Sequence, residues 1–128
     1  MAKLLLDTDV LVEWLRRNES VVTWVKARDA AGDYLGCTPV TIAEIYAGLR
    51  VREEFVVADL LRVLHCVEID ERVGRKAGHY RRTFGRSHGV EIADALIAAA
   101  AHVHGLTLVS LNLRHYPMRD VRKRRPVD

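Results

Sequence analysis

The chain has 128 residues, 49% of them hydrophobic and 29% charged, with a net charge of +3. These values are typical of a single globular domain. No stretch approaches the roughly 18 consecutive apolar residues of a membrane span, and the N-terminus lacks the features of a signal peptide, so we expect a cytoplasmic protein without a membrane partner.

The sequence alternates short apolar runs with amphipathic segments. In chain order we predict a strand over 3–7, a helix from Thr8 or Asp9, a helix from Ser20 towards Gly32, a strand over 34–37, a helix from Thr41, a helix over 55–64, a strand over 66–69, a helix over 71–86 that ends near Gly85, a helix over 91–104 and a strand over 106–110. Continuous apolar runs are typical of strands buried on both faces. Strand–helix alternation with short connections predicts an α/β fold of three layers, α/β/α, around a mainly parallel sheet.

The two cysteines, Cys37 and Cys66, stand singly in apolar contexts. No Cys-x-x-Cys spacing is present, which argues against zinc and redox chemistry. Because free cysteine is among the most buried residue types, we expect both thiols to be buried.

Three acidic residues occupy positions that would build a cation site in such a fold. Asp7 follows the first strand, Glu44 lies one turn into a helix, and Asp94 is near the start of the most apolar helix. Ligands of open parallel sheets bind at the carboxyl edge, so we expect the three carboxylates to converge there. Their like charges would resist ionising together, whereas Mg²⁺ binds carboxylate oxygens and can stabilise charge on a phosphodiester.

Each acid also has an alternative, structural explanation. Asp9 fits a helix N-cap, and Thr41 with Glu44 fits a capping box. Asp94 lies among apolar residues, where a buried carboxylate needs a partner or a metal. Backbone amides at the helix N-terminus are the third possibility for Asp94.

Charge is distributed unevenly along the chain. Up to residue 71 there are 8 Lys and Arg against 13 Asp and Glu, a balance of −5, and from Arg72 onward there are 12 against 4, a balance of +8. The basic half favours a polyanionic partner such as RNA. The alternative is a solvated helix face followed by a frayed tail.

Four spaced motifs together resemble the PIN domain, and more narrowly a VapC-type toxin ribonuclease of a type II toxin–antitoxin pair. The motifs are Asp7-Thr8-Asp9 after the leading strand, Thr41-x-x-Glu44-Ile45, the segment 92–101 around Asp94, and the segment 106–117. The resemblance extends from Leu4 to about Met118. It implies one PIN domain over residues 1–128 with a basic C-terminal tail over about 119–128, and a PIN-like α/β/α fold.

The resemblance also implies a Mg²⁺-dependent endoribonuclease that cleaves structured RNA such as tRNA or rRNA, with Mn²⁺ able to substitute. Asp7, Glu44 and Asp94 would be the catalytic acids, with Asp7 and Asp94 holding the ion and Glu44 acting directly or through a water. Thr8, Asp9, Ser110, Asn112 and His115 would lie beside the ion or the substrate. Arg114, Arg119, Arg122, Lys123, Arg124 and Arg125 would bind RNA. Asn112 and His115 stand where the family often has a fourth acid, which leaves open one metal ion or two.

Proteins of this type form homodimers, and a cognate VapB-type antitoxin inhibits them in a heterotetramer or larger complex. Trp14 and Trp24 would offer that partner an apolar surface. Two other interpretations remain: a catalytically silent PIN-like module that binds RNA or protein, and a haloacid-dehalogenase-like phosphatase with Asp7 as nucleophile and Asp9 as acid/base. The phosphatase needs a later lysine and an acidic pair, and after Ser110 only Lys123, Asp120 and Asp128 could serve.

Overall fold

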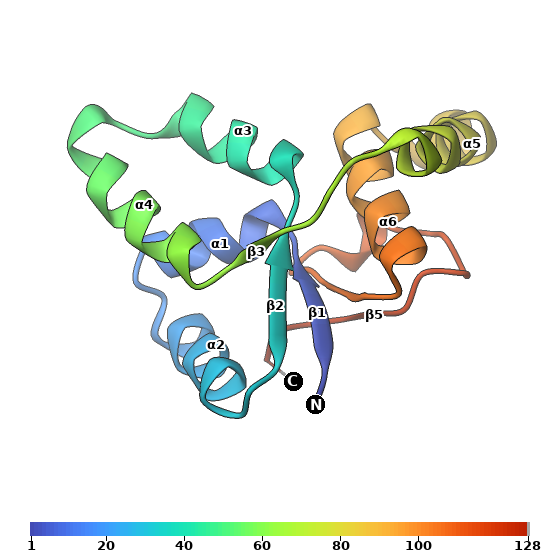
Figure 1. Cartoon of the computed structure of the whole chain (residues 1–128). Helices are drawn as coiled ribbons and strands as arrows, with labels where there is room; N and C mark the ends of the chain where they lie inside the picture. The colour runs from blue at the N-terminus through green and yellow to red at the C-terminus, as the bar shows by residue number, and fades with distance from the viewer. Residues whose placement is uncertain (128) are drawn as a thin grey trace.

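A computed structural model describes residues 1–127 (Figure 1), so Asp128, the last residue of the predicted domain, lies outside the described residues. The elements in chain order are β1 (Lys3–Leu6), α1 (Thr8–Leu15), α2 (Glu19–Ala30), β2 (Tyr34–Cys37), α3 (Pro39–Gly48), η1 (Val51–Glu53), α4 (Glu54–Arg62), β3 (His65–Cys66), α5 (Glu71–His88), α6 (Ile92–His104), β4 (Thr107–Val109), η2 (Leu113–His115) and β5 (Lys123–Arg124). Among these described elements no helix is long and apolar enough to cross a membrane.

The strands form one parallel sheet in the order β3-β2-β1-β4-β5. β1 is the central strand, and its residues Leu4, Leu5 and Leu6 are at most 2% exposed. The chain adds β2 and β3 on one side of β1, then crosses over to add β4 and β5 on the other. The strand order therefore reverses at β1, and ligands of open α/β sheets bind at such a reversal, outside the carboxyl ends of the strands.

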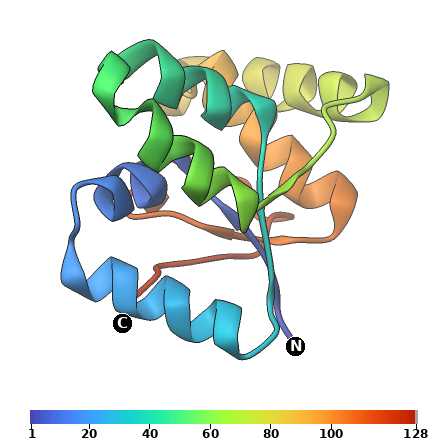
Figure 2. The ribbon, with the colours of Figure 1, turned by 60° about the vertical axis from the view of Figure 1, so that its left-hand side comes forward.

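Helices cover both faces of the sheet, which confirms the predicted three-layer α/β/α arrangement. One buried cluster joins Leu4, Leu6 and Leu35 of the sheet to α1, α2, α3 and α4. The second joins Leu5 and Leu108 to α5 and α6. Figure 1 shows the sheet between these two groups of helices, and in Figures 1 and 2 α4 lies between α3 and α2.

The helix α6 lies in the core, as its alanine-rich sequence predicts. Ala98, Ala99 and Ala100 are fully buried, and their small side chains allow close packing of neighbouring elements. The helix ends at Gly105, which has a left-handed φ of +67°. Glycine takes this conformation without the steric cost that other residues incur.

The N-terminal caps of α1 and α2 differ from those predicted. Asp7 itself caps α1 and accepts a hydrogen bond from Thr8 N, so Thr8 and Asp9 are already inside the helix. The capping explanation of Asp9 is therefore wrong. Asn18, rather than Ser20, caps α2 by accepting from Val21 N.

The helix α3 begins earlier than predicted. Thr38 is its N-cap and accepts from Thr41 N at 3.3 Å. Pro39 occupies the first helical position, where the missing N–H costs nothing. Thr41 is therefore not the cap, and the capping box with Glu44 is wrong, which leaves the Glu44 carboxylate available for another role.

The boundaries of β3 and α5 also depart from the sequence prediction. The strand predicted over 66–69 is the two-residue β3, and α5 continues past Gly85 to His88, where Gly89 ends it with a φ of +62°. Cys37 is buried as expected, but Cys66 is exposed because β3 is an edge strand.

The basic tail is not frayed. Within it, β5 pairs with β4, and Val121 is buried. Lys123 Nζ donates to the carbonyl oxygens of Tyr116 and Met118. The ammonium group of Lys123 therefore holds the segment after η2 against the sheet, and its role in RNA binding remains a prediction.

Candidate active site

The predicted site residues meet at the carboxyl edge of β1 and β4. Asp7 directly follows β1, and Ser110 directly follows β4. They lie beside a cleft of about 370 Å³ whose lining includes Asp7, Thr8, Asp9, Glu44, Asp94, Asn112 and His115. Ser110 is fully buried beneath it. The structure thus brings together the three predicted acids and the five residues predicted beside them, while their roles remain predictions.

Asp7 is held rigidly by three donors. One carboxylate oxygen, Oδ1, accepts from Thr8 N at 2.8 Å. The other, Oδ2, accepts from Ser110 Oγ at 2.9 Å and from Tyr116 Oη at 2.8 Å. Asp7 is only 6% exposed and Tyr116 is fully buried. Hydrogen bonds to a charged acceptor are stronger than neutral ones, so this network fixes the carboxylate at the strand end.

Glu44 reaches the site through a pair of threonines. Thr8 Oγ1 lies 2.6 Å from Glu44 Oε1 and 3.0 Å from Thr41 Oγ1. Because a hydroxyl carries a single proton, Thr8 donates to Glu44 and accepts from Thr41. The hydroxyl chain therefore connects α1 to α3 and positions an otherwise exposed carboxylate at the cleft.

Asn112 and His115 form a second chain that ends at Asp94. Asn112 Nδ2 lies 3.1 Å from His115 Nε2, and His115 Nδ1 lies 3.9 Å from Asp94 Oδ2. Since the amide nitrogen of Asn112 can only donate, Nε2 accepts and the proton of neutral His115 lies on Nδ1, facing Asp94. Asn112 and His115 stand where the family often has a fourth acid, and of these two residues His115 faces the acid Asp94.

Asp9 is the most unusual acid of the site. Its Oδ2 accepts from Leu111 N at 3.1 Å and lies 3.3 Å from Ser110 Oγ. Its Oδ1 is buried and makes no hydrogen bond within residues 1–127. Burial, and then the negative charge of Asp7, raise the pKa of Asp9 to about 6.

This raised pKa makes the stability of the metal-free protein depend on pH. Between its ordinary pKa of 3.8 and about 6, the Asp9 carboxyl binds its proton more tightly in the folded chain. The stabilisation is therefore complete below pH 3.8 and is lost as the pH rises through 6. Between pH 5 and pH 7 we expect Asp9→Asn to lose about 1 kcal/mol less stability than the parent chain loses, allowing for solvent screening.

Thermal unfolding in EDTA at the two pH values measures this difference. Glu13→Gln, at the rim of the same cleft, is the matched control and should keep the pH dependence of the parent chain. An equal pH dependence in Asp9→Asn and the parent would contradict the assignment.

The acids of the cleft affect one another electrostatically. Burial raises the pKa of Asp94, His115 lowers it, and the charges of Asp7 and Glu44 raise it further. The carboxylates of the cleft repel one another, and the buried Oδ1 of Asp9 lacks a hydrogen-bond partner within residues 1–127. A hard divalent cation, which binds carboxylate oxygens, would stabilise such an arrangement. As the side chains stand, no three His, Cys, Asp or Glu among residues 1–127 are arranged as a ready metal site.

Sequence reasoning missed four residues of the site. Tyr116 is the most important, because its hydroxyl also lies 3.4 Å from Asp94 Oδ1 and so stands between two of the acids. Thr41 supports Thr8, while Glu13 and Arg16 line the rim of the cleft. A buried tyrosine hydroxyl needs a hydrogen-bond partner, but that signal does not identify the partner.

The predicted RNA-binding residues divide into two groups. Arg114, Arg119 and Arg122 are exposed, and Arg114 belongs to η2 beside the cleft. Arg124 instead lies over the Trp24 ring, 5.2 Å from its centre, and Arg125 Nη1 donates to the Leu111 carbonyl. Lys123 and Arg124 are the half-buried residues of β5, whereas Arg125 follows that strand and is exposed.

The geometry does not support the phosphatase interpretation. Lys123, the one lysine that follows Ser110 in the sequence, binds main-chain carbonyls and does not approach Asp7. Both Asp7 oxygens already accept hydrogen bonds. A nucleophilic carboxylate with its partner lysine is therefore not assembled.

Comparison with known proteins identifies the family of the chain. A family model, the PIN domain, matches residues 4–121. Ribonuclease VapC10 of Mycobacterium tuberculosis is 35% identical over 116 residues, which cover 90% of this chain and 86% of the relative. A solved structure of FitAcB from Neisseria gonorrhoeae is 29% identical with a TM-score of 0.70, covering 96% of this chain and 97% of that one.

A second solved structure supports the fold. DNA-bound VapBC from Salmonella typhimurium is 22% identical with a TM-score of 0.82, covering 98% of this chain and 99% of that one. The family match spans most of the central strand, the four acids Asp7, Asp9, Glu44 and Asp94, and the first residues of the tail. The chain therefore belongs to the PIN domain family and, within it, to the VapC ribonucleases.

Proposed function

We propose that this chain is a Mg²⁺-dependent endoribonuclease of the VapC type, which cleaves structured RNA such as tRNA or rRNA in the cytoplasm. The observation that carries the proposal is the convergence of Asp7, Asp9, Glu44 and Asp94 on one cleft at the strand-order reversal. The kinship with Ribonuclease VapC10 supports the choice of RNA as substrate.

Asp7 and Asp94 would hold the ion, and Glu44 would contact it directly or through a water, with Mn²⁺ as an effective substitute. When bound, the ion supplies charge stabilisation to a phosphodiester under attack. The protein's own part is orientation: Ser110 and Tyr116 fix Asp7, and Thr8 turns Glu44 towards the cleft. His115 faces Asp94, 3.9 Å from its Oδ2, and would help to orient that carboxylate.

An acidic cleft repels RNA, so the chain needs positive charge around it. Arg114 lies beside the cleft, and Arg119 and Arg122 are exposed on the segment that leads to β5. We propose that these three arginines hold the phosphate backbone, because phosphate neutralisation supplies most of the sequence-independent affinity for nucleic acids.

Replacing Arg119 and Arg122 together with Ala tests this surface. We expect RNA affinity to fall about tenfold at physiological salt, and the slope of log affinity against log salt to fall by about 0.7–0.9 per lost phosphate contact. Fluorescence anisotropy with a labelled RNA hairpin, in Ca²⁺ to limit cleavage, measures both. Arg62→Ala on α4, an arginine as exposed as these, should change neither quantity, and an equal loss there would refute a localised surface.

We propose further that the chain acts as a homodimer and is inhibited by a cognate VapB-type antitoxin in a heterotetramer or larger complex. A groove of about 580 Å³ between α1, α2 and α4 has Trp14, Leu15, Val22 and Val56 among its lining residues. An apolar antitoxin segment would fit it. Trp24 is less available, because Arg124 covers its ring.

The experiment that tests the proposed activity is cleavage of total RNA and tRNA by the purified chain. We expect cleavage in Mg²⁺ or Mn²⁺, its disappearance in EDTA, and its return on adding excess metal. No cleavage of any RNA by the folded, metal-loaded protein would favour the silent PIN-like module, for which the replacement of the fourth acid by Asn112 is the supporting observation.

A further inference from the structure

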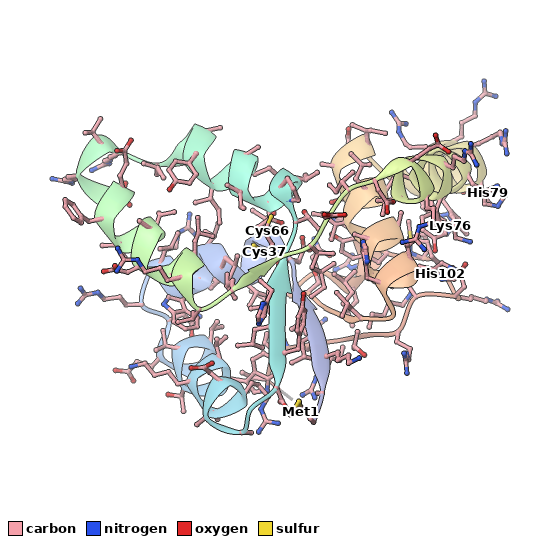
Figure 3. The ribbon with its side chains drawn as sticks, in the orientation of Figure 1. Met1, Cys37, Cys66, Lys76, His79 and His102 are labelled. Atoms are coloured by element: carbon pink, nitrogen blue, oxygen red, sulfur yellow. The ribbon has the colours of Figure 1, made fainter. Side chains whose placement is uncertain are left out.

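The two cysteines, separated by 28 residues in the sequence, are direct neighbours in the sheet, so the absence of a Cys-x-x-Cys spacing does not exclude redox chemistry between them. Cys37 ends β2, Cys66 ends β3, and they are register partners in the parallel pairing of these strands. Figure 3 shows their side chains next to each other at the sheet. The pair lies outside the acidic cleft and has no part in the proposed cleavage.

Both side chains are on the same face of the sheet. Leu35 and Cys37 of β2, and Leu64 just before β3, belong to the core beneath α1–α4. On the opposite face the rings of Tyr34 and His65 stack, with centres 4.4 Å apart. Because side chains alternate along a strand, Cys66 shares the face of Leu64 and therefore of Cys37.

The strands are close enough for a disulfide. Neighbouring strands lie about 4.8 Å apart, and disulfides usually join Cα atoms 4.4–6.8 Å apart. Gly36 contributes to this closeness: a Cβ there would come within 2.9 Å of Val67 Cγ2 and 3.4 Å of the His65 carbonyl oxygen. Cys66 also lies at the end of a two-residue edge strand, which pairs with a neighbouring strand on one side only.

The two thiols differ in reactivity. Cys66 is exposed, whereas Cys37 is 1% exposed. Burial, and then the proximity of Cys66, raise the pKa of Cys37 to about 11. Since the thiolate is the nucleophile, an oxidant in solution meets Cys66 first, and Cys37 reacts only with a neighbour that is already activated.

We propose that Cys37 and Cys66 form an oxidation site at which a hydroperoxide produces an intrachain disulfide. The Cys66 thiolate attacks one peroxide oxygen, the O–O bond breaks, and Cys66 becomes a sulfenic acid while hydrogen peroxide yields one water. The Cys37 sulfur then attacks the Cys66 sulfur, the S–O bond breaks, and the Cys37 proton leaves with the hydroxyl group as a second water. Two thiols are oxidised and one peroxide is reduced.

The disulfide would tether the segment that carries Glu44. Residues 37–66 include α3 and α4, and Cys37 directly precedes Thr38, the N-cap of α3. Closing this loop restricts the unfolded chain, so oxidation should raise the thermal midpoint of unfolding by several degrees. Excess dithiothreitol should reverse the rise.

Mass spectrometry of the full chain, treated with one equivalent of hydrogen peroxide and then with N-ethylmaleimide, tests the proposal. We expect a mass about 2 Da below that of the reduced chain, no maleimide adduct, and a linked peptide containing both cysteines. Neither Cys66→Ser nor Cys37→Ala should form the intrachain disulfide, so neither should show the loss of 2 Da. The measurement on the parent chain depends on neither the folding of a variant nor RNA cleavage.

Three results would overturn the proposal. They are a sulfinic or sulfonic acid at Cys66 with Cys37 still alkylated, a disulfide between two chains through Cys66, and two free thiols after peroxide treatment. Each would mean that the register neighbours do not pair. None of them bears on the proposed ribonuclease activity, so the two proposals fail separately.

Discussion

Asp94→Asn should lower the rate of RNA cleavage by on the order of 10³-fold. Asp94 lies at the start of α6 with its side chain 22% exposed, and it faces His115 across the cleft. Asparagine keeps the shape of the side chain but removes the negative charge that the ion would need. The loss should appear in Mg²⁺ and Mn²⁺ alike, measured as the rate of cleavage of total RNA and tRNA.

The same substitution should stabilise the metal-free protein. Burial raises the pKa of Asp94, and the charges of Asp7 and Glu44 add to that effect. The folded state therefore disfavours the ionised form, and the destabilisation is present at neutral pH and relieved as the pH falls. Without the charge, thermal unfolding in EDTA at pH 7 should occur a few degrees higher.

Asp59→Asn provides the matched control, since Asp59 lies on α4 with its side chain 70% exposed. Asp59→Asn makes the same chemical change at an exposed carboxylate, so it should alter neither cleavage nor stability. Cleavage that persists in Asp94→Asn would mean that the site is misassigned or that a contaminating nuclease is present.

Tyr116→Phe should destabilise the chain by about 1.5–3 kcal/mol, because it removes a buried hydrogen bond to a charged group. The Tyr116 hydroxyl is 2.8 Å from Asp7 Oδ2 and 3.4 Å from Asp94 Oδ1. With a single proton it donates to Asp7 and keeps the two acids in place. We also expect about tenfold slower cleavage, because the carboxylates lose a fixed orientation.

Tyr80→Phe is a close control for this substitution. The Tyr80 hydroxyl donates to Asp120 Oδ1, also at 2.8 Å, but the Asp120 side chain is 43% exposed and additionally pairs with Lys76. Solvent replaces the lost donor there, so the change in free energy of unfolding should be smaller and cleavage should be unaffected. Equal effects of the two substitutions in urea unfolding would contradict the assigned role of Tyr116.

The acidic site was predictable from the sequence because it depends on a simple rule. A buried strand reads as an apolar run, its end marks the carboxyl edge, and Asp7 stands at that end. The helix α6 is similarly evident, since its alanines and Gly105 define both its burial and its end. These signals are local, and each can be read within one segment.

What the sequence did not reveal depends on contacts between distant segments. Tyr116 lies 109 residues from Asp7, and nothing near Tyr116 in the sequence indicates that pairing. The sequence of β5, Lys123-Arg124, looks like part of a charged tail. It forms a strand only because it pairs with β4, and that pairing is not visible in the sequence. The predicted cap of α1 is wrong because Asp7, at the end of the apolar run, both caps α1 and lines the cleft.

Binding of Mn²⁺ to the antitoxin-free chain, followed by the loss of the free-ion signal in electron paramagnetic resonance, tests the central claim most directly because it requires no RNA. We predict saturable binding by the parent chain and by Asp59→Asn, and loss of that binding in Asp7→Asn and Asp94→Asn. Unchanged Mn²⁺ binding in both site variants, or none in the parent chain, would show that these carboxylates do not form a metal centre.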